Sequence, residues 1–227
     1  MGEPCDLLVV AAFPPELAGL DPGPDPEGLV VATRVVGVGM LAAAVGAAAA
    51  MEAVRPRAVL TGTCGAYANV RGAALHVNDV VVARTVMLVE PAVEEGRAAF
   101  PAMMSRSVDT HEGLRRALVA AGAPVADVAT TLAITTDDPL AAVLARCTGA
   151  MVEHLEAYGV AVACEARGIP FVAALGVANV VGSSGRAGWL AGHNAATRTV
   201  NQLLMQWIGE GGAGIPLVTR PASSRKR

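Results

Sequence analysis

The stretch "RAVLTGTCGAY", residues 57–67, joins a short aliphatic run to a turn rich in Gly and Thr. The aliphatic part is typical of a strand that is buried on both faces, as strands of parallel sheets are. The Gly-bearing turn, like the earlier "VVGVGM" (35–40), can bring backbone amides close to an anion or a sugar hydroxyl. Tight packing of a strand against a helix would explain the same glycines. The residues alone leave both interpretations open.

Strands and helices alternate on both sides of this stretch. We expect further strands at 6–13, 29–39, 78–89, 127–136 and 170–182, a strand end at 150–153, and helices at 40–54, 110–122, 137–147, 155–168 and 193–211. A turn-rich loop is expected at 21–28. This alternation predicts α/β architecture: a single-domain, three-layer α/β/α fold with a central mixed, largely parallel sheet. We place the domain at residues 1–212 and a flexible C-terminal tail at 213–227.

The composition excludes several classes of partner. The chain of 227 residues is 53% hydrophobic and only 3% aromatic, and its formal net charge is −3. A nucleic-acid-binding surface would normally show a basic patch or stripe, so we expect no nucleic-acid partner. The most apolar stretch, 35–51, is interrupted by Gly and Ala and is too weakly hydrophobic for a membrane span. We therefore expect no membrane partner.

The cysteines and the N-terminal residues indicate a compartment. The four cysteines, Cys5, Cys64, Cys147 and Cys164, are scattered, with no CxxC and no His/Cys cluster at zinc spacing. We expect them to be reduced and mostly buried, and we expect no metal. The opening "MGEPCDLLVVAAFPPE" lacks the basic segment that begins a signal peptide. Together these features predict a soluble, cytoplasmic protein.

Two acids lie in an otherwise apolar stretch, "AMVEHLEAYGVAVAC", residues 150–164. They are Glu153 and Glu156, and carboxylates are rarely buried without a partner because desolvating the charge is costly. A helix N-terminus would favour acids through its dipole. A ligand that needs a carboxylate would favour them equally, and the pattern alone does not decide between the two.

Five motifs, in order along the chain, resemble those of the nucleoside phosphorylase/nucleosidase superfamily. They are "GVGMLAAA" (37–44), "TGTCGAY" (61–67), "NDVVVA" (78–83), "VEHLEAYGVAVAC" (152–164) and "LGVANVVGSSGRAGW" (175–189). The opening "AAFPPEL" (11–17) is similar to that of futalosine hydrolases. The resemblance spreads over residues 7–200. It implies a nucleoside phosphorylase-like fold and a homo-oligomer that acts on a small purine nucleoside without a cofactor.

The resemblance also implies three catalytic residues. Glu16 matches the glutamate with which hydrolases of this family orient and deprotonate the attacking water. Glu156 matches the glutamate that accepts hydrogen bonds from the ribose diol. Asn179 stands where adenine-specific nucleosidases carry an aspartate. Its amide cannot supply a proton but can donate a hydrogen bond to N7 or O6 of a 6-oxopurine.

A second group is implied in substrate binding around the sugar and the base: Glu153, Leu155, Thr63, Gly65, Tyr158, Thr135 and Trp189. His154, between the two acids, reaches the substrate or faces solvent. Simple packing would account equally well for Tyr158 and Trp189.

The function implied is that of a purine nucleosidase that hydrolyses the N-glycosidic bond of a 5′-modified purine ribonucleoside. Futalosine, cleaved to hypoxanthine and dehypoxanthine futalosine in menaquinone biosynthesis, is the first candidate substrate. Phosphorylases of the superfamily hold phosphate with arginines, and Leu60 stands where one of them is expected. A methylthioadenosine/adenosylhomocysteine-type nucleosidase and a purine nucleoside phosphorylase are the alternatives. Because Leu175, Ala178 and Ala157 depart from the family pattern, a non-catalytic nucleoside-binding homologue is a further alternative.

Overall fold

The computed structural model of the protein describes residues 5–20, 29–53, 57–68, 70, 72 and 74–215. Its strands are β1 (Leu7–Ala11), β2 (Val31–Val35), β3 (Arg57–Ala66), β4 (Val80–Leu88), β5 (Ser107–Asp109), β6 (Val125–Thr130), β7 (Val152–His154) and β8 (Phe171–Val180). Its helices are the 3₁₀ helix η1 (Pro14–Leu17) and α1 (Met40–Ala53), α2 (Pro91–Glu94), α3 (Glu112–Ala120), α4 (Asp138–Thr148), α5 (Ala157–Glu165) and α6 (Gly185–Gly209).

The eight strands form one mixed sheet, with the order β2-β1-β3-β7-β6-β4-β5 and with β8 paired to both β3 and β4. Five strand pairs are parallel (β1–β2, β1–β3, β3–β8, β4–β6, β6–β7) and three are antiparallel. This confirms the mixed, largely parallel sheet that the sequence predicts. The pairings β3–β8–β4–β6–β7–β3 also close a ring, so that half of the sheet curls into a small barrel.

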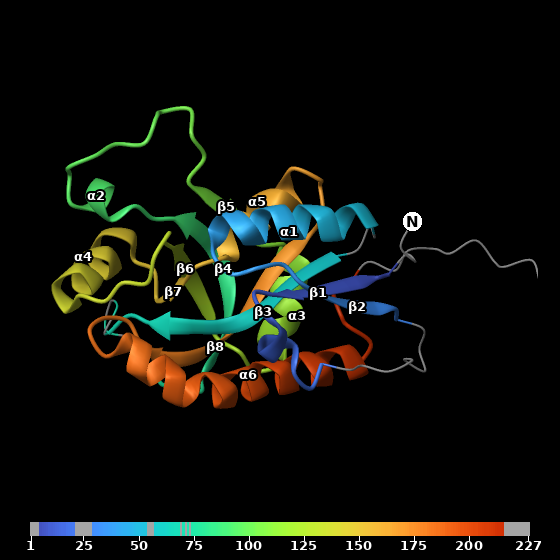
Figure 1. The fold of residues 1–227 in the computed structure, drawn as a ribbon. Helices are drawn as coiled ribbons and strands as arrows, with labels where there is room; N and C mark the ends of the chain where they lie inside the picture. Colours follow the sequence, from blue (N-terminus) through green and yellow to red (C-terminus); the bar gives the residue numbers. More distant parts are fainter. Residues whose placement is uncertain are drawn as a thin grey trace, which may run out of the picture.

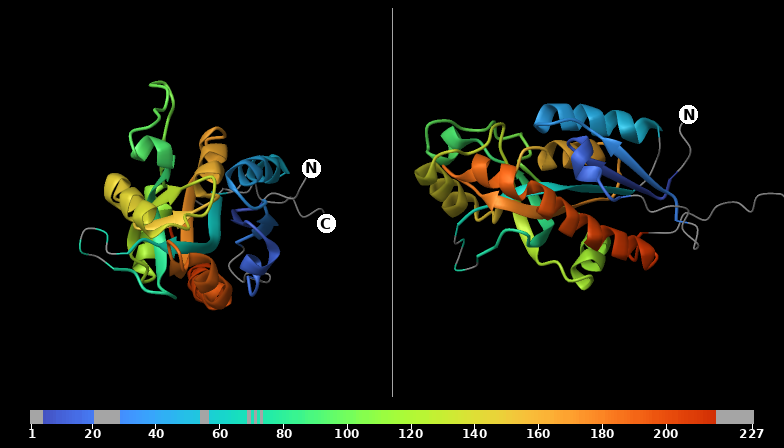
Figure 2. Two further views of the ribbon diagram at one scale, coloured as in Figure 1. Left: turned by 60° about the vertical axis from the view of Figure 1, so that its left-hand side comes forward. Right: turned by 60° about the horizontal axis from the view of Figure 1, so that its bottom comes forward.

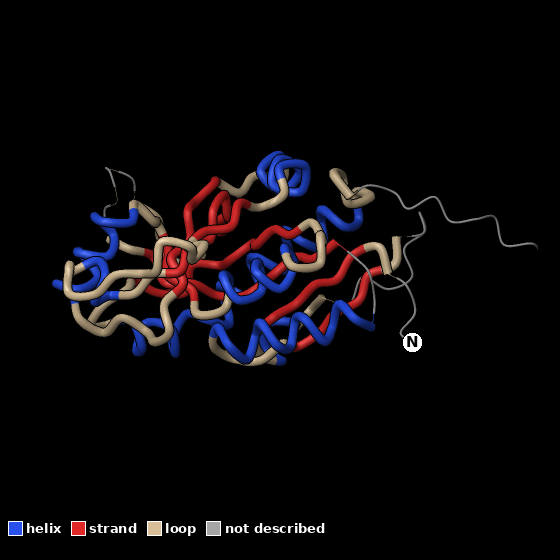
Figure 3. Tube along the Cα trace, turned by 90° about the horizontal axis from the view of Figure 1, so that it is seen from above, coloured by secondary structure: helices blue, strands red, loops and turns tan. Residues whose placement is uncertain are grey.

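Helices cover the sheet on both faces and make the expected three layers. Figure 1 shows α1 and α5 above the strands and α6 below them. Figure 2 shows α6 crossing the lower face with α3 beside it, and Figure 3 shows the strands enclosed by helices. Small residues bring α1 and α5 together: a Cβ on Gly159 would lie 2.3 Å from the carbonyl oxygen of Met40. The scarcity of aromatic residues thus accompanies close packing of α1 against α5.

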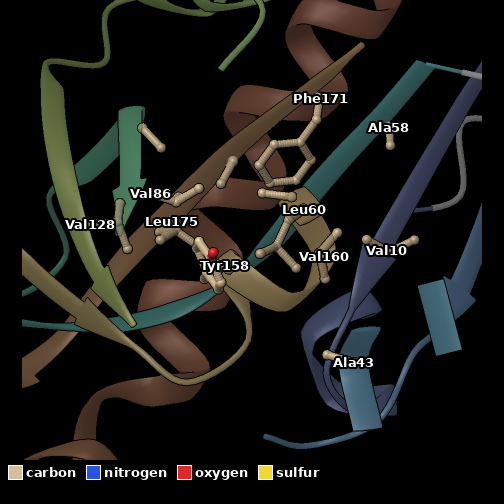
Figure 4. Close-up of a cluster of buried hydrophobic side chains, with 14 of the residues drawn as sticks. Val10, Ala43, Ala58, Leu60, Val86, Val128, Tyr158, Val160, Phe171 and Leu175 are labelled. Carbon is tan, nitrogen blue, oxygen red and sulfur yellow. The ribbon is translucent and has the colours of Figure 1, made fainter. Parts of the chain in front are cut away.

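The described residues form three hydrophobic clusters: a small one packs α4 against the ends of the strands, and the two larger cores lie on the two faces of the sheet. The larger one joins the inner faces of α1 and α5 to the strands, and the other joins α3 and α6 to the opposite face. Figure 4 shows Tyr158 among aliphatic side chains of the larger core, which include Val86, Leu60 and Leu175. These buried residues are the apolar positions of the strand-like and helical stretches that the sequence predicts. Burial on this scale is the main stabilising contribution to such a fold.

The predicted boundaries fail in two places beside the later strands. The strand expected at 127–136 ends at Thr130, because the following segment turns away and the backbone N–H of Thr135 donates to the side chain of Glu153. The last helix begins at Gly185 rather than at residue 193. Its first turns are rich in glycine, which lowers helix propensity. The glycines allow close packing on β8, since a Cβ on Gly192 would lie 2.5 Å from the carbonyl oxygen of Ala178.

The short elements α2 and β5 were not predicted from the sequence. The loop expected at 21–28 and most of the proposed tail, 216–227, lie outside the described residues. The first residues of that tail pack on the domain: the side chain of Ile215 is buried, and the indole N–H of Trp207 donates to the carbonyl oxygen of Ala213 at 3.1 Å. Within the described part of the chain, no helix is both long enough and apolar enough to cross a membrane.

Candidate active site

A cavity of about 390 Å³ opens at the end of the strand ring, where β3, β7 and β8 meet the first turn of α6. Strand register brings its residues together. Gly65, at the end of β3, pairs with Glu153 of β7 on one side and with Asn179 of β8 on the other. A Cβ at Gly65 would lie 2.8 Å from Val181 Cγ2 and 3.0 Å from Asn179 Nδ2. A larger residue at position 65 would displace the asparagine.

Glu16 enters the cavity from η1, the tight turn after β1. Its Oε1 accepts hydrogen bonds from the backbone N–H (2.9 Å) and hydroxyl (3.1 Å) of Thr63, and its Oε2 accepts one from the N–H of Ala12 (3.1 Å). The side chain is only 4% exposed. Burial, with a smaller contribution from the charge of Glu156, raises the pKa of Glu16 to about 7 despite these hydrogen bonds. A carboxylate with that pKa can accept a proton near neutral pH.

The turn that carries Glu16 is clamped by Asn201 of α6. The Asn201 amide donates to the carbonyl oxygens of Glu16 (2.9 Å) and Ala18 (3.0 Å), and its oxygen accepts from the hydroxyl of Thr61 (3.0 Å). Asn201 is buried. It holds η1 against β3, which fixes the acid over the cavity.

Glu156 faces the cavity from the residue before α5. Its Oε1 accepts a 2.7 Å hydrogen bond from the backbone N–H of Gly39, in the turn between β2 and α1. Gly39 has φ +88°, a conformation that L side chains rarely adopt. One glycine-bearing turn therefore does bind an anion, but that anion is a carboxylate of the protein itself. The carboxylate keeps acceptor capacity for a ligand.

His154 lies beneath Glu156 and is neutral. Its Nδ1 accepts the backbone N–H groups of Glu156 (3.1 Å) and Ala157 (3.2 Å) and lies 3.2 Å from Glu156 Oε2. Complete burial lowers the pKa of His154, and the charge of Glu156 only partly offsets this effect. A nitrogen that accepts two N–H groups has no proton to give the carboxylate, so the contact is not an ion pair. The histidine shapes the backbone at the start of α5.

Glu153 is held by groups of the protein. Its Oε2 accepts hydroxyl protons from Tyr67 (2.8 Å) and Thr135 (2.6 Å), and its Oε1 accepts the backbone N–H of Thr135 (2.9 Å). Burial and the carboxylate together raise the pKa of Tyr67, which keeps the phenol a donor. Glu153 therefore anchors the segment after β6 to the floor of the cavity.

Asn179 stands at the rim of the cavity, close to Gly65 and Gly185. One N–H of its amide donates to the carbonyl oxygen of Val180 at 2.9 Å. Among the described residues, the other N–H and the amide oxygen have no hydrogen-bond partner, so Asn179 can both donate to and accept from a ligand.

Comparison with solved structures identifies the fold. The 5′-methylthioadenosine/S-adenosylhomocysteine nucleosidase of Colwellia psychrerythraea, in complex with adenine, superposes with a TM-score of 0.79 at 20% identity, covering 96% of this chain and 99% of that one. The corresponding Helicobacter pylori enzyme, with butyl-thio-DADMe-Immucillin-A, gives 0.79 at 14% identity, covering 91% and 99%. A futalosine hydrolase mutant of Helicobacter pylori gives 0.78 at 13% identity, also covering 91% and 99%.

The chain has the nucleosidase fold. No protein-family model matches it, and no curated protein matches it in sequence. At these identities, the likeness to the solved structures concerns the fold, and the roles of individual side chains rest on the geometry of the cavity.

Nine of the ten residues proposed from the sequence line the cavity of this nucleosidase fold: Glu16, Thr63, Gly65, Thr135, Glu153, Leu155, Glu156, Asn179 and Trp189. Tyr158 is outside the lining. It belongs to the larger core, and its hydroxyl donates to the carbonyl oxygen of Ser105 at 2.6 Å. The backbone N–H of Thr135 donates to Oε1 of Glu153 at 2.9 Å.

Several lining residues were not proposed from the sequence. Phe13, Val38, Ile134 and Leu190 make the mouth apolar, and Arg186 stands in the first turn of α6. Arg186 is in the motif "GSSGRAGW" and could have been noticed there. The four apolar residues come from four separate segments and carry no shared pattern. In the part of the chain that the structure describes, no group of three His, Cys, Asp or Glu residues is placed to hold a metal ion.

Proposed function

We propose that this protein is a purine nucleosidase that cleaves the N-glycosidic bond of a 5′-modified purine ribonucleoside with water. One observation carries the proposal: two buried acids, Glu16 and Glu156, face one cavity from separate elements and keep acceptor capacity there. The pKa of Glu16 of about 7 suits a general base near neutral pH. The nucleosidase fold supports the same reaction class.

In this mechanism, the bond between C1′ of the ribose and N9 of the purine breaks, and its electron pair leaves with the base. Positive charge develops on the ribose, and the carboxylate of Glu156, hydrogen-bonded to the sugar hydroxyls, stabilises it. The oxygen of water forms the new bond to C1′, and Glu16 takes the water proton. The departing base gains a proton from solvent, since Asn179 holds it by hydrogen bonds and has no acidic proton to give.

Asn179 favours a 6-oxopurine as the leaving base. An amide N–H can donate to N7 or to O6, whereas an aspartate acid would be needed to protonate N7 of adenine. We therefore propose a hypoxanthine-type base and, as the first candidate substrate, futalosine, which would place the protein in menaquinone biosynthesis. Arg186, at the start of α6, is available to pair with a carboxylate of such a substrate.

A methylthioadenosine/adenosylhomocysteine-type activity is the second candidate, and the mouth of the cavity favours it. Val38 is 63% exposed, Leu190 59% and Ile134 48%, and all three line the opening. Exposed apolar side chains around a polar pocket suit an apolar 5′ substituent. The two candidates differ in the leaving base, so base analysis separates them.

Water rather than phosphate is the proposed nucleophile. A phosphate dianion is usually held by arginines as a bidentate fork, and Arg186 is the one cationic side chain among the described residues of the lining. Leu60 and Leu175 are fully buried in the cores. Neither can supply a charge at the positions where a phosphorylase or nucleosidase relative would carry arginine.

We further propose that the protein is a cytoplasmic homo-oligomer in which a second copy covers the apolar mouth. Leu41 and Val45, four residues apart on α1 and close to Val38 in the sequence, are 75% and 72% exposed. Several large apolar side chains exposed near a cavity favour an interaction site. Light scattering coupled to size-exclusion chromatography, on wild type and on Leu41→Glu, tests this: the variant should elute as the smaller species.

The function is tested by chromatography of released base. Futalosine, inosine, methylthioadenosine and adenosylhomocysteine are each incubated with the protein, with and without phosphate. Hypoxanthine released from futalosine without phosphate supports the proposal. Adenine released from methylthioadenosine would instead support the second candidate, a methylthioadenosine/adenosylhomocysteine-type activity. A strict need for phosphate would make the protein a phosphorylase. Binding without release from any of the four would leave a non-catalytic homologue.

The matched variants are Glu16→Gln and Glu52→Gln. Both remove one carboxylate, but Glu52 lies on the outer surface of α1 and pairs with Arg167 at 3.3 Å. Glu16→Gln should release almost no base, and Glu52→Gln should release base at the wild-type rate. Equal activity of the two variants would show that Glu16 is not the base.

A further inference from the structure

Trp189 is connected to Glu16 by a chain of two hydrogen bonds. Its indole N–H donates to the hydroxyl oxygen of Thr63 at 3.0 Å, and that hydroxyl donates to Oε1 of Glu16 at 3.1 Å. Trp189 is on α6, Thr63 on β3 and Glu16 on η1, so the chain joins three elements that surround the cavity.

The direction of these hydrogen bonds is fixed by chemistry. An indole nitrogen can only donate, so the Thr63 oxygen must accept from Trp189. The hydroxyl has a single proton, which is then directed to Glu16. Because Oε1 of Glu16 also accepts the backbone N–H of Thr63, both of its lone-pair positions are occupied. Oε2 accepts only from Ala12 among the described residues and keeps one position open.

We infer that Trp189 is a positioning residue for the general base: through Thr63 it occupies Oε1 of Glu16 and leaves Oε2 as the oxygen that takes the proton of water. This inference rests on the proposed hydrolysis. It goes further because it assigns which oxygen of Glu16 takes the proton. It also gives Trp189 a role in positioning the base, in addition to lining the cavity. The covalent step is unchanged, since the water proton passes to Oε2 as the water oxygen bonds to C1′.

The setting of Trp189 keeps its ring in one orientation. The indole stacks on His193, with ring centroids 4.4 Å apart and an interplanar angle of 16°. It also lies beside the ring of Phe13, with ring centroids 6.1 Å apart. His193 is held in turn by a contact between its Nδ1 and the carbonyl oxygen of Trp189 at 3.0 Å. A ring fixed in this way directs its N–H to one acceptor without losing further rotamer freedom on each turnover.

Two further titratable groups among the described residues interact with Glu16. Glu156, before α5, raises the pKa of Glu16 by its charge, and the charge of Glu16 raises the pKa of the Cys64 thiol on β3. Burial raises the pKa of the Cys64 thiol far above neutral, so it stays uncharged. The hydrogen bonds from Thr63 act in the opposite sense and lower the pKa of Glu16. Loss of the Trp189 N–H frees the Thr63 hydroxyl to turn away and should therefore raise that pKa.

The kinetic test uses Trp189→Phe, which keeps an aromatic ring for the stack and removes the N–H together with the second ring of the indole. In wild type, kcat/KM should rise with pH to a plateau above about 7, because the base must be ionised. In Trp189→Phe the midpoint of the rise should move up by about 0.5–1 pH unit, so that below the midpoint kcat/KM, taken relative to the variant's own plateau, is roughly 3–10-fold lower than in wild type. Thr63→Val should show the same shift, and Thr63→Ser should keep the wild-type midpoint. A midpoint that stays at the wild-type pH in Trp189→Phe, whatever the height of the plateau, would overturn the inference.

A second measurement does not depend on activity. The chain has two tryptophans, so its ¹H–¹⁵N spectrum contains two indole N–H resonances. The Trp189 resonance should titrate with the ionisation of Glu16, at a midpoint near 7, and should stop moving in Glu16→Gln. Trp207 donates to the carbonyl oxygen of Ala213 and serves as the internal control. If the Trp189 resonance titrates unchanged in Glu16→Gln, the inference fails. If wild type releases no base while this titration holds, the proposed function fails and the hydrogen-bond chain stands.

Discussion

Glu153 and Glu156 lie three residues apart, and both are buried, at 7% and 5% exposure. Their surroundings are opposite. Glu153 accepts three hydrogen bonds, two of them from the hydroxyls of Tyr67 and Thr135. Among the described residues, the Glu156 side chain accepts one backbone N–H, from Gly39, and its second oxygen faces a neutral histidine nitrogen that has no proton to donate.

The difference separates structural support from ligand binding. The three hydrogen bonds of Glu153 fix the segment after β6 and leave the carboxylate about one of its four acceptor positions, as those of Glu16 do. Among the described residues, Glu156 keeps about three such positions beside the cavity, and the hydroxyls of a ribose are suitable donors for them. In the proposed function, the stretch from residue 150 to 164 therefore contains one acid that mainly supports the fold and one that binds the ligand.

Replacing Glu156 by Gln should have the largest effect. The amide keeps the size of the side chain but removes the negative charge that favours the cationic sugar, so kcat/KM should fall by about 10²–10³-fold. Thermal unfolding should change little, because only the hydrogen bond from Gly39 depends on Glu156. Steady-state kinetics with Glu52→Gln as control provides the check. A loss below about tenfold would place Glu156 with Glu153 as structural support.

The pH dependence of the free energy of unfolding should show that Glu16, like Glu156, is an acid of the site and does not simply support the fold. Its pKa in the folded protein is about 7, above its ordinary value of 4.5. The folded state therefore binds the proton more tightly than the unfolded state, and the free energy of unfolding should fall as pH rises from 4.5 to 7. The full difference is on the order of 3 kcal/mol. Urea unfolding at pH 5 and pH 8 measures it, and Glu16→Gln should remove most of this slope. A slope that survives the substitution would assign it to other groups.

The sequence predicted the layers, the mixed sheet and most of the residues that line the cavity. The spacing of apolar residues and the order of the motifs can both be read directly from the chain. The residue pattern alone could not distinguish Glu153 from Glu156, and only the resemblance gave the two acids different roles. The donors to Glu153 include Tyr67, 86 residues away, and the donor to Glu156 is Gly39, 117 residues away. The start of α6 was missed for a related reason: the need for glycine comes from the packing of Gly192 on β8, which no local pattern reports.

Replacing Glu153 by Gln should mainly affect stability. The amide nitrogen cannot accept a hydroxyl proton, so Tyr67 or Thr135 would lose its acceptor in a buried place, at a cost of about 1–3 kcal/mol. The kcat/KM value should stay within about tenfold of wild type, since the carboxylate acts on the cavity only through the segment it anchors. Combining Tyr67→Phe with Glu153→Gln tests the assignment. If the hydrogen bond is responsible, Tyr67→Phe should cost less free energy of unfolding in the double variant than it does alone.

A substitution at Ala157 should have the smallest effect, and it tests the comparison most finely because Ala157 directly follows Glu156 and departs from the family pattern that the sequence resembles. Its side chain is fully buried at the first position of α5, and its backbone N–H donates to His154 at 3.2 Å. Ala157→Gly should destabilise the protein by about 1 kcal/mol, through the lost methyl group and the added freedom of the unfolded chain. Activity should not change, since the methyl group belongs to the core and Glu156 is held from the other side by Gly39. A gain in kcat/KM would mean that the methyl group pushes Glu156 away from its ligand-binding position. The spare acceptor capacity of that carboxylate would then reflect misplacement by Ala157.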